Sequence, residues 1–337
     1  MRFGWRSTVG IVVTVLLLWW ALRDVSPATV VNELARADFM LFFLATVAAT
    51  AIFALRAARW RIILEPLGLS VPFGPAWRAT NIGMMVNNLV PARAGELARA
   101  YALTREVRGL PLPASIASLA VDRAFDAIAL LLLGLVAILD PALPATATIA
   151  GRSLAGWAGA GGLLVAALLA ALYALVAFPD AMIRWWAVGA RRLSPRLEDR
   201  GRLALRAFSD GLGALRSPTR FLRVFAWTVA HWLLGALSFW LGFLAVGIDA
   251  PFTAAFLVQT LIAFGVAVPA APGFFGVFEA LAIVGLALYG VDRASATTFA
   301  IGFHILTFIP VTALGAHYSA RLGLRLRELG APPATVT

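Results

Sequence analysis

Charged side chains interrupt several apolar stretches of this 337-residue chain, and three of them lie at a spacing that could bind an anion. Glu96 is three residues from both Arg93 and Arg99, so on a helix the three side chains share one face. Arginine binds phosphate or carboxylate through paired N–H donors. We therefore expect Arg93 and Arg99 to contact a phosphate group; an internal salt-bridge network is the alternative.

A second charged group, formed by Asp122, Arg123 and Asp126, lies inside a long apolar segment. The two aspartates are four residues apart, and like charges at that spacing repel each other on a helix. A cation should therefore lie opposite them, with Arg93 or Arg99 as the natural partner. The group would tune and gate the anion site, or it would form a fixed structural network.

Glu279 is a third candidate, because it follows Pro272, Gly273 and Gly276 in a segment rich in Phe. Burial disfavours a charged carboxylate, so Glu279 could bind a proton, or it could cap backbone groups at a helix break. Asn88 belongs to another interrupted segment, where its amide could satisfy the broken backbone or bind a polar group.

Three arginines end an apolar segment at Arg56, Arg59 and Arg61. An arginine at the end of a span often lays its stem along apolar surface and extends its head to the polar boundary. We expect Arg56 to be such an interface anchor and Arg61 to belong to the candidate anion site.

The composition indicates what kind of fold must position these residues. The chain is 61% apolar and 13% charged, whereas soluble domains are roughly 45–50% apolar and about 25% charged. All 28 basic residues are Arg, there is no Cys, and no nucleotide-binding loop or HExxH metal motif occurs. A membrane protein without a cofactor is expected, and the Arg clusters beside apolar segments indicate membrane orientation rather than nucleic-acid binding.

About six segments have the length of roughly 20 mostly apolar residues that a helical span needs. They are Thr8–Leu22, Phe39–Leu55, Leu112–Leu139, Trp157–Phe178, Phe221–Val246 and Ala294–Ser319. Three shorter apolar segments border Pro and Gly: Ala76–Val90, Pro251–Val268 and Phe274–Tyr289. The expected fold is an all-α polytopic membrane protein with a single domain over residues 1–337, consisting of a first half at about 8–139, a cytoplasmic Arg-rich loop at about 180–220 and a second half at about 221–319.

Two of the short segments are followed by similar breaks. Pro91 and Gly95 follow the first, and Pro269 with the Pro272-Gly273 pair follows the second. Arg clusters flank only the first break, and since cytoplasmic loops carry excess Arg, the two hairpins should enter from opposite sides, with both termini cytoplasmic. Paired broken or re-entrant hairpins in an inverted repeat mark the binding site of many transporters; ordinary Pro turns are the alternative.

Four motifs then follow one another along the chain. They are Arg59-Trp60-Arg61, Asn88-x-x-Pro91-x-Arg93-x-Gly95-Glu96-x-x-Arg99, Asp122-Arg123-x-x-Asp126 and Pro272-Gly273-x-x-Gly276-x-x-Glu279. From about residue 10 to 325, the chain resembles the transmembrane region of bacterial lysylphosphatidylglycerol synthases and the wider flippase-like integral membrane family. It departs from that pattern in having Asp122 where Glu is usual and Phe at positions near Gly276 where Gly is common.

The resemblance implies transport rather than synthesis, because the soluble transferase domain of the full synthases does not follow before Thr337. We expect a flippase-like transporter that moves an aminoacyl-phospholipid, a glycolipid or a polyprenyl-linked lipid between leaflets of a bacterial inner membrane. The expected partners are lipids with an anionic or glycosylated head group, and a separate synthase or a second copy of the chain. The alternatives are a membrane-embedded head-group transferase, with Asp122, Asp126 or Glu96 as base, and a non-catalytic partner of a synthase.

Overall fold

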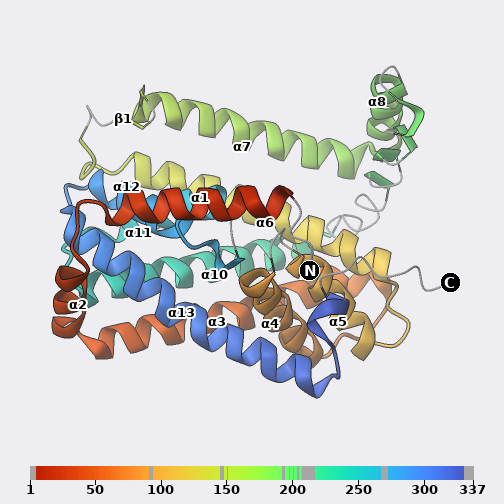
Figure 1. Ribbon diagram of the computed structural model, residues 1–337. Coiled ribbons are helices and arrows are strands. Elements are labelled where there is room, and N and C mark those ends of the chain that lie inside the picture. The colour runs from red at the N-terminus through yellow and green to blue at the C-terminus, as the bar shows by residue number, and fades with distance from the viewer. Residues whose placement is uncertain are drawn as a thin grey trace.

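The computed structural model describes residues 5–90, 94–144, 148–149, 151–191, 194–196, 198–199, 201–202, 205–206, 217–266 and 272–329. Within these ranges the elements are helices, apart from one pair of two-residue strands (Figure 1). The predicted all-α polytopic fold is therefore confirmed.

The first half contains α1 (Trp5–Leu22), α2 (Pro27–Arg36), α3 (Phe39–Leu64), α4 (Phe73–Leu89), α5 (Gly95–Glu106) and α6 (Leu112–Ile138). The strands β1 (Thr148–Ile149) and β2 (Arg152–Ser153) precede α7 (Leu154–Ala177) and α8 (Pro179–Arg191). The second half contains α10 (Pro218–Ala245), α11 (Phe252–Gly265), the 3-10 turn η4 (Pro272–Phe274), α12 (Val277–Ala287), α13 (Arg293–Arg321) and α14 (Leu326–Leu329).

Three helical segments of the described chain are long and apolar enough to cross a membrane, namely Phe39–Leu67, Pro218–Ala245 and Arg293–Arg321. A fourth is counted if α1 and α2, whose axes differ by 73°, form one bent span. Helices α6 and α7 are 27 and 24 residues long, which is also enough to cross about 30 Å of hydrocarbon. The three short segments of the sequence form α4, α11 and α12.

Helices α3 and α10 pack against each other as the central antiparallel pair of the bundle. At one end, the Asp38 N–H before α3 donates to the Ala245 carbonyl at the end of α10, at 2.8 Å. At the other end, Glu65 pairs with Arg220 and Arg223 at 3.3 and 3.2 Å. The two helices therefore run past each other for their full lengths and supply the wall to which both hairpins attach.

The first hairpin, α4–α5, is tight because glycines remove side chains where the two helices cross. A Cβ on Gly83 would lie 2.7 Å from both the Gly95 carbonyl oxygen and the Arg99 Cβ. The Gly95 N–H donates to the Asn87 amide oxygen at 2.9 Å. Gly95, a predicted helix-break residue, is thus the first residue of α5, and it lies against the backbone of α4.

The second hairpin, α11–α12, turns through η4. Gly273 and Gly276 have φ values of 73° and 85°, which side chains with a Cβ rarely adopt, and the Gly276 N–H donates to Glu279 at 2.6 Å to cap α12. Helix α4 packs against η4, so the inner parts of the two hairpins meet. In Figure 1, α4 and α5 lie toward the end of the bundle where α13 finishes, and α11 and α12 lie toward the end where it begins. The two hairpins therefore lie toward opposite ends of the bundle, and their entry from opposite sides of the membrane stays a prediction.

Helix α7 lies at the side of this bundle, against α6, and leads to α8 (Figure 1). On α8, Trp185 and Val188 are exposed, and Arg184 and Arg191 are on the same helix. An amphipathic basic helix with exposed Trp is typical of segments that lie in a membrane interface. Helix α8 is the described beginning of the Arg-rich region expected on the cytoplasmic side.

Candidate functional site

Two carboxylates on α6 share one buried arginine. Arg59 of α3 lies 2.6 Å from Asp122 and 2.7 Å from Asp126, measured between guanidinium nitrogens and carboxylate oxygens. The Thr228 hydroxyl of α10 accepts another N–H of Arg59 at 2.9 Å. Arg59, Asp122 and Asp126 are all buried, and the arrangement ties α3, α6 and α10 together at one level of the bundle.

Arg99, on α5, is the second arginine that pairs with Asp122. Its guanidinium lies 3.0 Å from Asp122 and 4.0 Å from Glu96, and its central carbon lies 4.1 Å from the ring centre of Trp60. The Trp60 indole N–H donates to Ser118 at 2.8 Å. Arg99 is thus the expected cation opposite Asp122, but it is buried inside the network and does not line the cavity described below.

Asp126 is the most highly connected carboxylate. Arg123 lies 3.2 Å from it and also pairs with Glu96, so α5 and α6 are joined a second time. The Trp232 indole N–H donates to Asp126 at 3.1 Å, and the His231 Nε2 is 3.4 Å away. We call Arg59, Arg99, Glu96, Asp122, Arg123 and Asp126 the ionic network.

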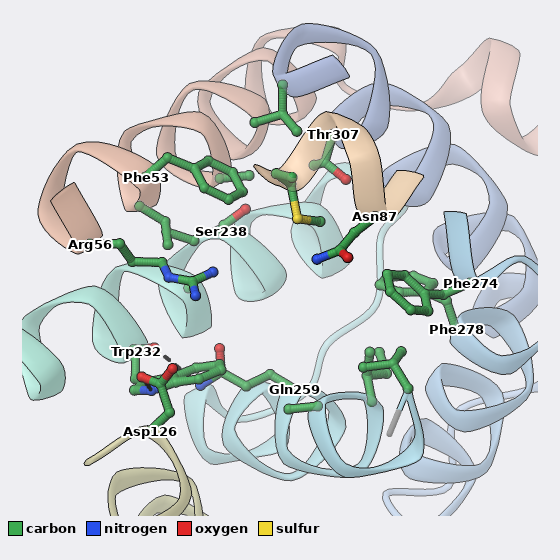
Figure 2. Close-up of a pocket in the computed structure, with 18 of the residues that line it drawn as sticks. Phe53, Arg56, Asn87, Asp126, Trp232, Ser238, Gln259, Phe274, Phe278 and Thr307 are labelled. Atoms are coloured by element: carbon green, nitrogen blue, oxygen red, sulfur yellow. Dashed lines mark hydrogen bonds between the residues drawn. The ribbon is translucent and has the colours of Figure 1, made fainter. Parts of the chain in front are cut away.

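A cavity of about 460 Å³ lies beside this network, where both hairpins meet α3, α6, α10 and α13 (Figure 2). Polar groups line one part of it: Arg56, Asn87, Asn88, Glu96, Arg123, Asp126, His231, Trp232 and Gln259. Aromatic rings line another: Phe53, Phe239, Phe264, Phe274, Phe278, Phe303 and Phe308. The cavity is therefore amphipathic, as a site for a lipid head group with an attached chain would be.

Arg56 differs from the arginines of the network. In Figure 2 its guanidinium extends from α3 into the cavity, with Asp126 and Trp232 on the facing wall. No carboxylate of the described chain lies within 4.0 Å of Arg56, and its buried Nε has no hydrogen-bond partner. The sequence predicts Arg56 to be an interface anchor; in the structure it lines the cavity, and its depth in a membrane stays a prediction.

The other predicted residues lie at different places. The Arg61 Nε donates to the Val71 carbonyl at 2.7 Å and holds the connection between α3 and α4, away from the cavity lining. The Asn88 amide donates to Thr312 at 2.7 Å at the cavity wall. The predicted residues Pro91, Arg93 and Pro269 lie outside the described residues.

Glu279 lies within the aromatic part of the site, with its side chain buried at the start of α12. One oxygen accepts the Gly276 N–H, as the capping interpretation predicts, and the other lies 2.7 Å from His304 Nδ1. His304 and Trp232 line the cavity, whereas the sequence predicts His304 only as a hydrogen-bonding residue inside a span and gives Trp232 no role. Their only sequence signal is a polar atom within a long apolar helix.

Relatives that match this chain are membrane proteins. Two proteins of Methanothermobacter thermautotrophicus, each named UPF0104 membrane protein, are 25% and 26% identical to it over 95% and 92% of this chain and 93% and 94% of their own lengths. Glycosyltransferase AglD of Haloferax volcanii is 35% identical over 37% of this chain and 22% of its own length. Residues 7–315 match the family described as the Lysylphosphatidylglycerol synthase TM region. The chain therefore belongs to the family of the lysylphosphatidylglycerol synthase transmembrane region and is a multi-pass membrane protein.

Proposed function

We propose that this protein moves a lipid with an anionic or glycosylated head group between the leaflets of a cell membrane, with the head group passing through the cavity. The observation that carries the proposal is Arg56, a cation inside an amphipathic cavity that has no carboxylate partner in the described chain. Arg56 is half-buried, and its guanidinium faces the cavity. A bound anion would therefore meet a cation that no carboxylate of the described chain contacts within 4.0 Å.

The cavity lining fits a phosphate that carries a polar substituent. Arg56 can hold two phosphate oxygens through its paired N–H donors. The Asn87 and Gln259 amides and the Trp232 ring lie around the same space (Figure 2), and amides with an aromatic face suit glycerol, amino-acid or sugar groups. A cavity of about 460 Å³ has the size of an ordinary small-molecule site, so it can hold a head group while the acyl chains remain in the bilayer.

The two hairpins would connect the cavity to both leaflets of the membrane. They enter from opposite ends of the bundle and meet at the cavity, and a movement of either hairpin would open a route to one side. We place the N- and C-terminal ends on the cytoplasmic side, since the Arg-rich segments of the sequence lie with them. Lipids are the proposed partners, and a separate synthase or a second copy of the chain would act on or beside the same lipid.

A membrane-embedded transferase is the second candidate, favoured by the partial match to a relative named Glycosyltransferase AglD. Such an enzyme needs a base or a metal ligand. Asp122 and Asp126 are both held by Arg59 inside the bundle, and no group of three metal-ligating side chains occurs among the described residues. The geometry therefore favours transport without chemistry on the lipid.

The proposal predicts a large loss of transport in Arg56→Gln. Full-length protein is reconstituted in phosphatidylcholine vesicles containing fluorescent phosphatidylglycerol, and lipid exposure in the outer leaflet is followed by dithionite quenching. The rate should fall by about 10- to 100-fold, the effect of losing one charge-assisted contact of roughly 1.5–3 kcal/mol. Arg223→Gln, which removes the same charge from an exposed position on α10, should transport like wild type.

Two results would overturn the proposal. One is a wild-type rate no higher than that of protein-free vesicles for both fluorescent phosphatidylglycerol and a fluorescent glycolipid. The other is a rate in Arg56→Gln equal to that of wild type, with the protein correctly folded. Conversion of the labelled lipid to a new species by the purified chain would support the transferase instead.

A further inference from the structure

Three acidic side chains are buried in the described bundle, and they differ in what they pair with. Asp122 and Asp126 pair with Arg59, and arginine stays protonated at every physiological pH. Glu279 pairs with His304 instead, at 2.7 Å, and no arginine of the described chain lies within 4.0 Å of it. Histidine is the side chain that changes charge between about pH 5 and 8. Asp126 also has His231 at 3.4 Å, but Arg59 and Arg123 pair with the same carboxylate. Glu279 and His304 are thus a buried carboxylate–histidine pair without an arginine, and a proton on the ring would change its net charge.

We propose that Glu279 and His304 form a proton-binding site that couples proton uptake to the binding of an anionic head group in the adjoining cavity. One Glu279 oxygen accepts the Gly276 N–H at 2.6 Å, and the other accepts the Nδ1–H of His304. The Nε2 of His304 is left to receive the added proton. The pair carries −1 with a neutral ring and 0 with an imidazolium, and no bond between heavy atoms changes.

The surroundings accept both charge states. The His304 ring lies 4.2 Å from the ring of Phe278 and 4.5 Å from that of Phe275, stacked with each. Aromatic faces stabilise a cation held over them, so the imidazolium is accommodated even though the side chain is largely buried. His304 also lines the cavity, which gives a proton a route to its ring from the space that holds the head group.

The helices around the Glu279–His304 pair contain few other ionisable side chains. Helices α11 and α12 contain no ionisable residue except Glu279, and α1 contains only Arg6. On the remaining neighbours, Glu33 of α2 accepts the Thr298 hydroxyl, and Arg78 of α4 pairs with Glu106. The charged or titratable groups that share the cavity with His304 are Arg56, Glu96, Arg123, Asp126 and His231.

The charge of the pair should control anion binding. Glu96, Arg123 and Asp126 already pair with one another, so an incoming phosphate meets chiefly Arg56 and the Glu279–His304 pair. With a neutral ring the pair is negative and repels the phosphate; with an imidazolium this repulsion disappears. Proton and anion therefore bind together, and each raises the affinity for the other by the same factor. This inference rests on the proposed function, because it concerns the same cavity.

A direct test uses the fact that the chain has three His. Full-length protein with ¹³C,¹⁵N-labelled histidine is titrated by NMR in phosphatidylcholine nanodiscs, and each signal is assigned by substitution. The signal lost in His304→Gln should change from the neutral-ring pattern to the imidazolium pattern as acid is added, and Glu279→Gln should alter that change. A His304 signal that stays constant as acid is added would overturn the inference, whether or not the protein transports lipid.

A transport test uses the fluorescent phosphatidylglycerol assay at about pH 5.5 and 8.0, on either side of the histidine range. The wild-type rate should be about tenfold higher at the lower pH, since one neutralised charge beside the anion is worth about one power of ten. Glu279→Gln and His304→Gln should show little pH dependence. His317→Gln, exposed on the same helix α13, should behave like wild type.

The outcomes separate the two proposals. Both substitutions keep a polar partner: glutamine at 279 retains an oxygen for the Gly276 N–H, and glutamine at 304 retains a donor for Glu279. Wild-type transport that does not change with pH, or a pH dependence that persists in His304→Gln, would overturn the proton site and leave lipid transport standing. Absence of any wild-type transport would overturn the proposed function, while the NMR titration would still decide the proton site.

Discussion

Replacing Arg59 with Met should lower the free energy of unfolding by about 3–5 kcal/mol, because breaking a buried pair leaves uncompensated charge. Arg59 is fully buried, and its loss would leave the three carboxylates of the ionic network with only two cations, Arg99 and Arg123. The measurement is the thermal unfolding of detergent-solubilised protein, followed by the height of the monodisperse size-exclusion peak. Arg223→Met is the control, since its ion pair is exposed and such pairs contribute only about 0–1 kcal/mol.

A rescue experiment identifies the cause. In the background of Arg59→Met, converting Asp126 to Asn removes the excess negative charge, leaves Asp122 with Arg99 and Glu96 with Arg123, and should recover a large part of the lost stability. If Arg59→Met unfolds at the same temperature as Arg223→Met, the ionic network does not hold α3 to α6. The experiment also separates the two interpretations left open by the sequence, a fixed structural network and a gating group of an anion site.

Gly95→Ala should be similarly damaging, with a loss of more than about 3 kcal/mol, at the upper end of the range for overpacking. The added Cβ would overlap the Gly83 carbonyl oxygen and the Asn87 amide oxygen. Backbone atoms cannot swing aside as the end of a flexible side chain can, so the α4–α5 hairpin would have to open. The same unfolding assay measures the loss.

The matched control is Gly159→Ala on α7, where an added Cβ would meet nothing within 4 Å. Alanine in a helix interior is favoured over glycine by about 0.5–1 kcal/mol, so this variant should be as stable as wild type or more stable. Wild-type stability in Gly95→Ala would show that the helices do not cross at this glycine pair. Retained stability with lost transport would instead place the hairpin's effect in the transport step.

The sequence predicts the architecture well because its signals are local. Apolar length gives the helices, and Pro and Gly near residues 91–95 and 269–276 give the breaks. The alternation of Arg-rich loops predicts that the two hairpins enter from opposite sides, and they lie toward opposite ends of the bundle. Pairing across the bundle is harder to predict, because it depends on how each helix is rotated. The Arg99–Asp122 pair was expected, whereas Arg59 comes from α3, which is distant in sequence from α6.

The three arginines of α3 show, within a single helix, why side-chain pairing is hard to predict from sequence. Arg56 precedes Arg59 by three residues, so the two side chains point about 60° apart around α3, which is enough to send one into α6 and the other into the cavity. Arg61, five residues after Arg56, points about 140° away from it and binds the Val71 carbonyl instead. Sequence alone does not show where each of the three arginines points, and only the packing of α3 gives them their three different surroundings.

The cavity has walls of unequal stiffness. On one side, α3, α6 and α10 are joined by the short ion pairs and hydrogen bonds of Arg59 and Asp126, which must break completely before those helices can separate. On the other side, α12 and α13 meet through the Glu279–His304 pair and through stacked rings such as Phe278 and Phe303, and rings can slide past one another with little loss of contact area. We therefore expect conformational change to be concentrated on the aromatic side. The helices joined by the ionic network would keep their positions, and α12 would move relative to them.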